Sequence, residues 1–544
     1  MVMSAEEDHH SPDCDNTCLS DEYMRLEPNE VTFIDLFKFL FLKDNKKWEF
    51  IKTESLKKDK INPFDYPNEE PKFIDHKENN KKKQSSKPFE YRWIVFVCIF
   101  IQKLLLFDSK PFKYRWIVFV CIFIQKLLQF VSKPLSWAGS KFEMWLNICS
   151  RNGNISGLLL KLLRWEIIEI PETDSENYFS FIGCLDKRME LPNHIKHGDP
   201  TYYSSIAVMA SKLSYENQSH VKKIVTDFWK MEFKGFYDFW NDYQDKPTTQ
   251  AFIFINKNVE PELTVVAFRG TETFDADAWC TDLDLSWFDL EKIMGKGTGK
   301  AHCGFMKALG AKKGQGWPEN IEEEKGEVLK KLAYYEIRKI LKEVFRENDK
   351  GRFIVTGHSL GGALAVLFPA ILSHHNEKDL LKRMEGVYTF GQPRVGDEEF
   401  GNFMTKMFRE HEIGYHRFVY GNDIVPRLPY DDTTLMFKHF GSCILFDSSY
   451  IGDVVDDEPN KNYFSRKWFW KKIKIACKEL KRSFTIAREK SDDYKEGWML
   501  MFIRMVGLVC PGFSAHSLRD YDNSVRLGLD DVFSRHKHKL CHYN

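Results

Sequence analysis

Hydrophobic and polar positions change their pattern at about residue 200. Downstream, short apolar runs at 251–255 and 263–268 predict two neighbouring strands joined by a polar turn, and apolar residues at helical spacing over 324–347 predict a helix. Further strands are expected at 353–356, 386–390 and 417–420, with a helix over 360–373 that kinks at Pro369. This alternation predicts an α/β fold with a mainly parallel central sheet covered by helices.

The pattern is weaker upstream of residue 86. Residues 1–85 alternate short apolar runs with charged stretches and predict a partly disordered N-terminal segment. The segment 86–135 contains an internal repeat, because YRWIVFVCIFIQKLL at 91–105 returns unchanged at 114–128. Each copy has nine uninterrupted apolar residues, fewer than the roughly 20 that span a bilayer, and so predicts an interfacial, re-entrant or buried segment.

We expect this repeat to associate with a lipid surface. The two copies could form a hairpin that enters and leaves by the same face, or both could lie flat along the interface. The alternatives are that the copies pack as two ordinary core helices, or that one copy is a dispensable duplication. The rest of the chain is expected to divide into a connecting helical region at 136–200, an α/β unit at 200–530 and a C-terminal tail at 531–544.

A basic and aromatic insertion interrupts the α/β pattern at 441–510. It holds nine Lys or Arg residues between Lys461 and Arg482, beside Trp468 and Trp470. This combination predicts either a solvated basic helix or an element that lies on a membrane surface. Over the whole chain, 79 Lys and Arg balance 79 Asp and Glu, and no nucleic-acid module is recognisable, so we expect no nucleic-acid partner.

The cysteines and the N-terminus indicate the compartment. Twelve Cys in 544 residues are too sparse for a disulfide scaffold, and residues 1–15 are polar and acidic, without the apolar core of a secretory signal. We therefore expect a protein that faces the cytosol. No C-x-x-C pair occurs, and Cys14 and Cys18 are interpreted as thiols of a tail, so neither a metal nor an organic cofactor is expected.

The strongest chemical signal is the G-x-S-x-G motif at 357–361, which stands between a predicted strand and a predicted helix. Its glycines allow a serine to occupy a sharp turn where strand and helix approach closely, and the helix N-terminus then faces any anion that develops there. The motif predicts that Ser359 is a nucleophile.

A serine nucleophile needs a base and a carboxylate that orients the base, and α/β-hydrolases place both downstream in the order Ser, Asp, His. We favour Asp423 because it follows a short strand, where ligands bind in such sheets; Asp431 and Asp432 are the alternatives. We favour His516 as the base because a polar loop precedes it and a helical run follows. His439 is the alternative, although its Phe neighbours favour a packed, structural histidine.

These motifs resemble those of the class 3, fungal-type triacylglycerol lipases of the α/β-hydrolase fold, and most closely the plant oil-body triacylglycerol lipases. The resemblance covers roughly residues 200–530 and rests on six motifs in the family's order. They are VAFRGT at 266–271, AHCGF at 301–305, GHSLGGALA at 357–365, TFGQPRVG at 389–396, NDIVP at 422–426, and His516 followed by Tyr521.

The resemblance implies roles for further residues. Thr271 and Leu360 would donate backbone N–H groups to the oxyanion, each worth on the order of 3 kcal/mol. His302 and His358 would be structural. Residues 274–290 would form an amphipathic lid, whose apolar residues are Trp279, Leu283, Leu285, Trp287 and Phe288.

The resemblance also implies the function. We expect hydrolysis of acylglycerol esters, above all triacylglycerols, at the surface of a lipid droplet (oil body) or of the endoplasmic reticulum membrane, on its cytosolic face. A phospholipase A1 or a galactolipid acylhydrolase would share every catalytic motif and is the alternative enzyme. A catalytically inactive lipid-droplet coat protein is the alternative from a different class, and the complete set of Ser, Asp and His argues against it.

Overall fold

The computed structural model describes residues 22–26, 31–41, 48, 51–55, 110–192, 195–312, 316–321, 330–432, 435–463, 468–509 and 511–540. Much of the expected N-terminal segment, the first copy of the repeat at 91–105 and most of the C-terminal end after 540 lie outside these residues, as do Cys14 and Cys18.

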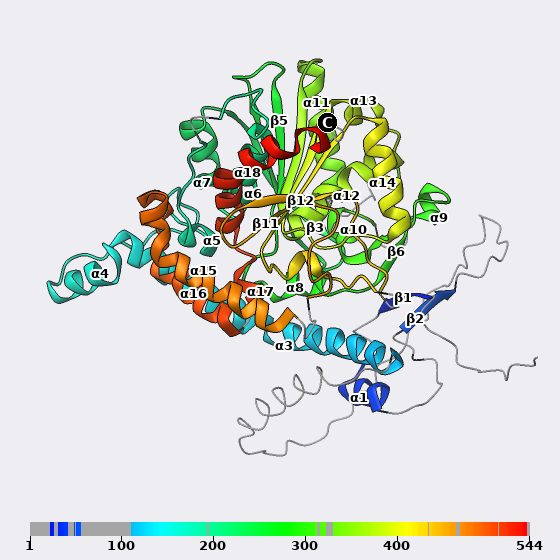
Figure 1. The fold of residues 1–544 in the computed structure, drawn as a ribbon, viewed down its shortest axis with the longest axis horizontal. Coiled ribbons are helices and arrows are strands. Elements are labelled where there is room, and N and C mark those ends of the chain that lie inside the picture. Colours follow the sequence, from blue (N-terminus) through cyan, green and yellow to red (C-terminus); the bar gives the residue numbers. More distant parts are fainter. Residues whose placement is uncertain are drawn as a thin grey trace, which may run out of the picture.

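An eight-stranded sheet forms the centre of the molecule (Figure 1). Its order is β12-β11-β10-β9-β8-β5-β4-β3. Pairing is parallel from β5 through β8, β9 and β10 to β11, and antiparallel at the two edges. The mainly parallel sheet is therefore confirmed. The strands are β3 (Glu232–Asn241), β4 (Lys246–Asn256), β5 (Leu263–Phe268), β8 (Arg352–His358), β9 (Met384–Phe390), β10 (Gly414–Tyr420), β11 (Cys443–Phe446) and β12 (Gly452–Val455).

Helices cover both faces of the sheet and bury an apolar core on each side. One core contains residues of α10, α11, α12 and α14, and the other contains residues of α6 and α18. The helices are α10 (Cys303–Leu309), α11 (Ala333–Glu347), α12 (Leu360–His374), α14 (Glu398–Glu410), α6 (Tyr202–Leu213) and α18 (Leu518–Leu540). Because α12 follows β8 directly, the serine between them lies at the carboxyl end of a central strand, where ligands bind in α/β sheets.

Further helices lie at the lower end of the sheet in Figure 1, where α15, α16 and α17 pack together and α3 passes beneath α8 and contacts it. These helices are α3 (Lys110–Arg151), α8 (Ala276–Asp282), α15 (Phe469–Glu489), α16 (Trp498–Val509) and α17 (Pro511–Ser514). The remaining elements are β1 (Glu22–Leu26), α1 (Phe33–Phe41), β2 (Ile51–Ser55), α4 (Asn154–Leu163), α5 (Phe181–Leu185), α7 (Gln218–Lys223), η3 (Ile224–Phe228), β6 (Trp287–Asp289), α9 (Glu291–Met294), β7 (Lys300–His302), α13 (Lys378–Arg383), η4 (Val425–Arg427) and η6 (Asp492–Tyr494).

The second copy of the repeat forms part of α3, which continues through Pro134 to Arg151. One face of this copy, with Val118, Phe119 and Ile122, is fully buried in a cluster that α1 and the body of the protein share. The helix therefore runs without a break across the expected boundary at 135–136, and the first copy, the other arm of the expected hairpin, lies outside the described residues. α18 likewise crosses the expected boundary at 530–531.

α3 is nevertheless, among the described residues, the helix that is long and apolar enough to cross a membrane. Only 22% of its most apolar window is buried. Gln125, a polar residue within the apolar repeat, is buried. Its side chain donates a hydrogen bond at 2.8 Å to the carbonyl of Leu283, which stands at the C-terminal end of α8. The second copy thus packs along the protein and leaves other parts of its surface uncovered.

The segment expected as a lid is divided between two elements. Residues 276–282 form α8, but Leu285 and Trp287 are buried in the cluster shared with α3. The Trp287 ring stacks on Phe437 with 3.8 Å between centroids. The chain leaves the helical conformation after Asp282, and Trp287 begins β6, so Trp279 and Trp287 lie on different elements of the segment expected as a lid.

Candidate active site

Ser359 occupies a strained turn between β8 and α12. Its backbone has φ 58° and ψ −128°, a conformation that non-glycine residues rarely adopt. A Cβ atom on Gly357 would stand 2.2 Å from the backbone of Gly361, and one on Gly361 would stand 2.3 Å from the Phe268 carbonyl oxygen. Both glycines are thus required by close backbone approach, which is the physical reason for the motif.

His516 lies between α17 and α18 and points to the serine. Its Nε2 atom is 2.8 Å from the Ser359 hydroxyl, and its Nδ1 atom is 2.7 Å from a carboxylate oxygen of Asp423. A histidine between a hydroxyl and a carboxylate can remove the hydroxyl proton while the carboxylate fixes its tautomer. The structure therefore brings together the three residues that the sequence separates by 157 positions.

Asp423 is fully buried on the loop that follows β10. One of its carboxylate oxygens accepts a hydrogen bond from the Val425 N–H at 2.9 Å. The other accepts from the Tyr521 hydroxyl at 2.5 Å in addition to its contact with His516. Burial and the neighbouring carboxylate raise the pKa of Tyr521 well above its usual range, so this hydroxyl remains a donor. Tyr521 was part of a sequence motif, but its contact with Asp423 could not be read from spacing.

The residue before the serine supports the base from one side. The His358 ring stacks on His516 with 4.4 Å between centroids, and its Nδ1 atom is 2.9 Å from the Tyr215 hydroxyl. Burial lowers the pKa of His358 well below its usual range, and the proximity of His516 lowers it further. A neutral His358 adds no charge beside the base, which agrees with the structural role expected for it.

The two residues expected at the oxyanion are Thr271 and Leu360. Thr271 lines the same cavity as Ser359, and Leu360 follows the serine as the first residue of α12. The Thr271 hydroxyl donates to Asp282 of α8 at 2.8 Å. Burial raises the pKa of Asp282 to about 7. Asp282 was missed in the sequence, where it is one acidic residue among several in an amphipathic segment.

The cavity at Ser359 has a volume of about 90 Å³, whereas sites that enclose small molecules measure roughly 300–1,000 Å³. Its apolar walls come from several elements. They include Phe181, Ile182 and Leu185 of α5, Trp279 of α8, Ile503 of α16 and Phe513 of α17. Trp279 and Phe513 stack on each other with 6.3 Å between ring centroids. The site is thus narrowed by α5, α8, α16 and α17.

The alternative site residues have other partners. The His439 Nε2 atom is 2.7 Å from the Pro426 carbonyl oxygen, and burial lowers the pKa of His439 well below its usual range. His302 caps α10 and stacks on Phe305. Asp431 pairs with Lys461, and Asp432 accepts from the Leu435 N–H. These contacts indicate structural roles for all four residues.

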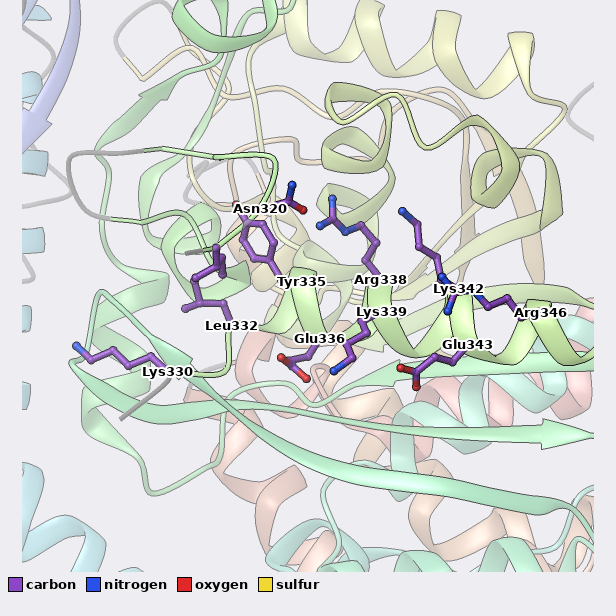
Figure 2. A pocket seen from close by; sticks show the side chains of 11 residues that line it. Asn320, Lys330, Leu332, Tyr335, Glu336, Arg338, Lys339, Lys342, Glu343 and Arg346 are labelled. Carbon is purple, nitrogen blue, oxygen red and sulfur yellow. The ribbon is translucent and has the colours of Figure 1, made fainter. Parts of the chain in front are cut away.

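A second hollow, of about 420 Å³, opens along the outer side of α11 (Figure 2). It is lined mainly by long charged side chains, such as Lys339, Lys342 and Arg346. No serine or histidine is among the described residues that line it. Within the part of the chain that the structure describes, no group of three or more His, Cys, Asp or Glu residues could hold a metal ion. The contacts between a serine, a histidine and a carboxylate therefore lie at Ser359 and not in this hollow.

Comparisons with known proteins show which family this chain resembles. The family described as Lipase (class 3) matches residues 265–433. Triacylglycerol lipase OBL1 of Arabidopsis thaliana is 40% identical over 94% of this chain and 95% of its own. The proteins of the same name from Nicotiana tabacum and Ricinus communis are 38% and 35% identical, over 81% and 72% of this chain and 84% and 82% of their own.

The sheet and the elbow serine define an α/β-hydrolase, the class to which the lipases belong. Within it, the chain belongs to the class 3 lipase family and groups with the plant triacylglycerol lipases OBL1. The resemblance seen in the motifs is thereby confirmed. A solved structure, the triacylglyceride lipase of Rhizomucor miehei, is 22% identical over 47% of this chain and 83% of its own, with a TM-score of 0.34.

Proposed function

We propose that the protein is a triacylglycerol lipase in which Ser359, His516 and Asp423 form the catalytic triad. The observation that carries the proposal is the continuous chain of contacts from the Ser359 hydroxyl through the His516 ring to the Asp423 carboxylate. His516 removes the hydroxyl proton as the serine oxygen attacks the ester carbonyl carbon, and Asp423 stabilises the imidazolium that forms.

The reaction then proceeds in two stages, each through a tetrahedral intermediate. In the first, His516 gives its proton to the departing glycerol oxygen, which leaves an acyl group on Ser359. In the second, water deprotonated by the same histidine attacks the acyl carbon, and His516 returns the proton to the Ser359 oxygen as the fatty acid leaves. The N–H groups of Thr271 and Leu360 stabilise the oxyanion in both stages, and the contact between the Thr271 hydroxyl and Asp282 holds Thr271 beside the serine.

Two observations support a lipid surface as the place of reaction. The narrow cavity of about 90 Å³ is too small for an acylglycerol, so substrate binding requires displacement of its apolar walls. Exposure of such walls is favourable against oil and unfavourable against water. The relatives named triacylglycerol lipase support the same substrate class. We place the enzyme on the cytosolic face of a lipid droplet (oil body) or of the endoplasmic reticulum membrane.

The substrate class is tested by incubating the purified full chain with three emulsified lipids: triolein, phosphatidylcholine and a galactolipid. We expect the fatty acid released from triolein to exceed that from each polar lipid at least tenfold, because the walls around Ser359 are mainly apolar. Faster release from a polar lipid would instead establish the phospholipase or galactolipase alternative. No release from any lipid would favour the inactive coat protein. A Ser359→Ala preparation is the control for contaminating lipases.

A further inference from the structure

α16 exposes its apolar residues and buries its charged residue, which is the reverse of the usual arrangement in a surface helix. Phe502, Met505, Val506 and Val509 are exposed, with Val509 82% exposed. The one charged residue of the helix, Arg504, faces inward and is 1% exposed. Surface helices of soluble proteins bury the apolar side and expose the charged side. We call the exposed residues 502, 505, 506 and 509 the outer face of α16.

Buried ion pairs hold the helix in this orientation. The Arg504 guanidinium lies 2.7 and 2.8 Å from the two carboxylate oxygens of Asp520, and 3.1 Å from Glu496. Arg482 of α15 reaches the same Asp520 at 2.8 Å. Because leaving any of these charges unpaired in the interior is costly, α16 cannot rotate its apolar residues inward without breaking the network. The outer face is therefore a fixed property of the surface.

The outer face continues into the narrow cavity at the serine. Ile503, the neighbour of Phe502, lines that cavity, and so does Phe513 of the following helix α17. Phe513 is also 54% exposed, so its side chain reaches from the cavity wall to the surface. A hydrocarbon chain that left a lipid phase along α16 would thus meet apolar side chains continuously up to Ser359.

The surroundings of the outer face have the character of a lipid interface. On the neighbouring helix α15, Trp470 is exposed, together with a row of cations. The exposed cations are Lys471, Lys474, Lys478, Lys481 and Arg488. On the other side, Trp145 of α3 contacts Trp498 of α16 with 6.4 Å between ring centroids. Aromatic residues and cations around an apolar patch favour a phospholipid surface, where the cations meet anionic headgroups.

We propose that the outer face of α16 inserts into the phospholipid monolayer of a lipid droplet and is the route by which acyl chains enter the site. The inference rests on the proposed lipase function and deepens it, because it assigns interfacial binding to the insertion rather than to the duplicated segment or to α8 alone. α16 and α17 supply the docking surface and a wall of the cavity at once.

The test compares two double variants of the full chain on two substrates. Val506→Asp with Val509→Asp charges the outer face, and Phe228→Asp with Ile451→Asp charges equally exposed apolar positions on η3 and on the β11–β12 turn. We expect the α16 variant to hydrolyse triolein droplets coated with phosphatidylcholine and phosphatidylserine at least tenfold more slowly than the wild type. Its rate on soluble p-nitrophenyl butyrate should stay within twofold, and the control pair should change neither rate.

Three results would overturn the proposal. The first is a rate on droplets that is unchanged in the α16 variant. The second is a rate that falls equally on droplets and on the soluble ester, both in the double variant and in Val509→Asp alone. The third is a wild type that is a dimer in analytical ultracentrifugation while the α16 variant is a monomer. The outer face would then be covered by a second copy of the chain.

A measurement without turnover separates this proposal from the proposed function. The measured quantity is the highest surface pressure at which the protein still inserts into a phospholipid monolayer. In a Ser359→Ala background, this pressure should be lower for the α16 variant than for its parent. Equal pressures would contradict the inference even if the wild type hydrolysed no acylglycerol, and a lower pressure would support it in that case too.

Discussion

Replacing Ser359 by alanine is expected to lower the rate of ester hydrolysis by a factor of roughly 10⁴ to 10⁶, since members of a triad act as one unit. The hydroxyl contributes little to packing, so the unfolding temperature should change by less than about 2 °C. His516→Ala should lower the rate to a similar extent, because Nε2 is the atom within 2.8 Å of the serine oxygen. Rates on triolein and on a soluble ester measure both effects.

His439 provides the matched control for the base. Its side chain is 2% exposed, against 13% for that of His516, and it hydrogen-bonds the Pro426 carbonyl, so His439→Gln should retain turnover within about tenfold even if stability falls. Activity that survived in His516→Ala and disappeared in His439→Gln would reverse the assignment of the base.

Replacing Arg504 by alanine is expected to have the largest effect on stability among the residues of the insertion. Asp520 and Glu496 would then share the single cation Arg482, and the loss of a buried, paired charge costs about 3–5 kcal/mol. Asp520 also lies in the first turn of α18, only four positions after His516, so turnover should fall as well. The measurement is the urea midpoint of unfolding, together with the rate on a soluble ester.

The exposed Arg488 at the end of α15 offers the control for a general effect of removing an arginine. Arg488→Ala should shift the free energy of unfolding by no more than about 0.5 kcal/mol, as is usual for exposed charges. If Arg504→Ala and Arg488→Ala unfolded at the same urea concentration, the buried network would not be what holds α16 in place.

The sheet and the elbow were accessible to sequence reasoning because they rest on local patterns. Continuous apolar runs identified the buried strands, and β5 at 263–268 has the predicted limits. The glycines around Ser359 are required by the close approach of β8 and α12. Asp423 and His516 were harder, because the insertion separates them by 93 positions, and only their chain order and loop context distinguished them from other acids and histidines.

Features that depend on distant partners could not be predicted. The Gln125 side chain appeared only as an interruption of an apolar repeat, whereas its acceptor, the Leu283 carbonyl, lies 158 positions away. The apolar composition of α16 is equally compatible with a buried helix, and only its partner Asp520 determines that Arg504 faces inward. The division of 274–290 between α8 and β6 was also not predictable, because alternating apolar and acidic residues suit a strand as well as a helix.

The most direct test of the account is covalent trapping of the nucleophile with a long-chain alkyl phosphonate p-nitrophenyl ester on lipid droplets. Attack by a serine oxygen on phosphorus forms an oxygen–phosphorus bond and expels p-nitrophenolate, so each active chain should release one equivalent of chromophore. Mass spectrometry of the digested protein should then place the alkylphosphonyl group on the peptide with Ser359, and Ser359→Ala should acquire none. A label on any other residue, or a chain that hydrolyses triolein without becoming labelled, would contradict the assignment of Ser359 as the nucleophile.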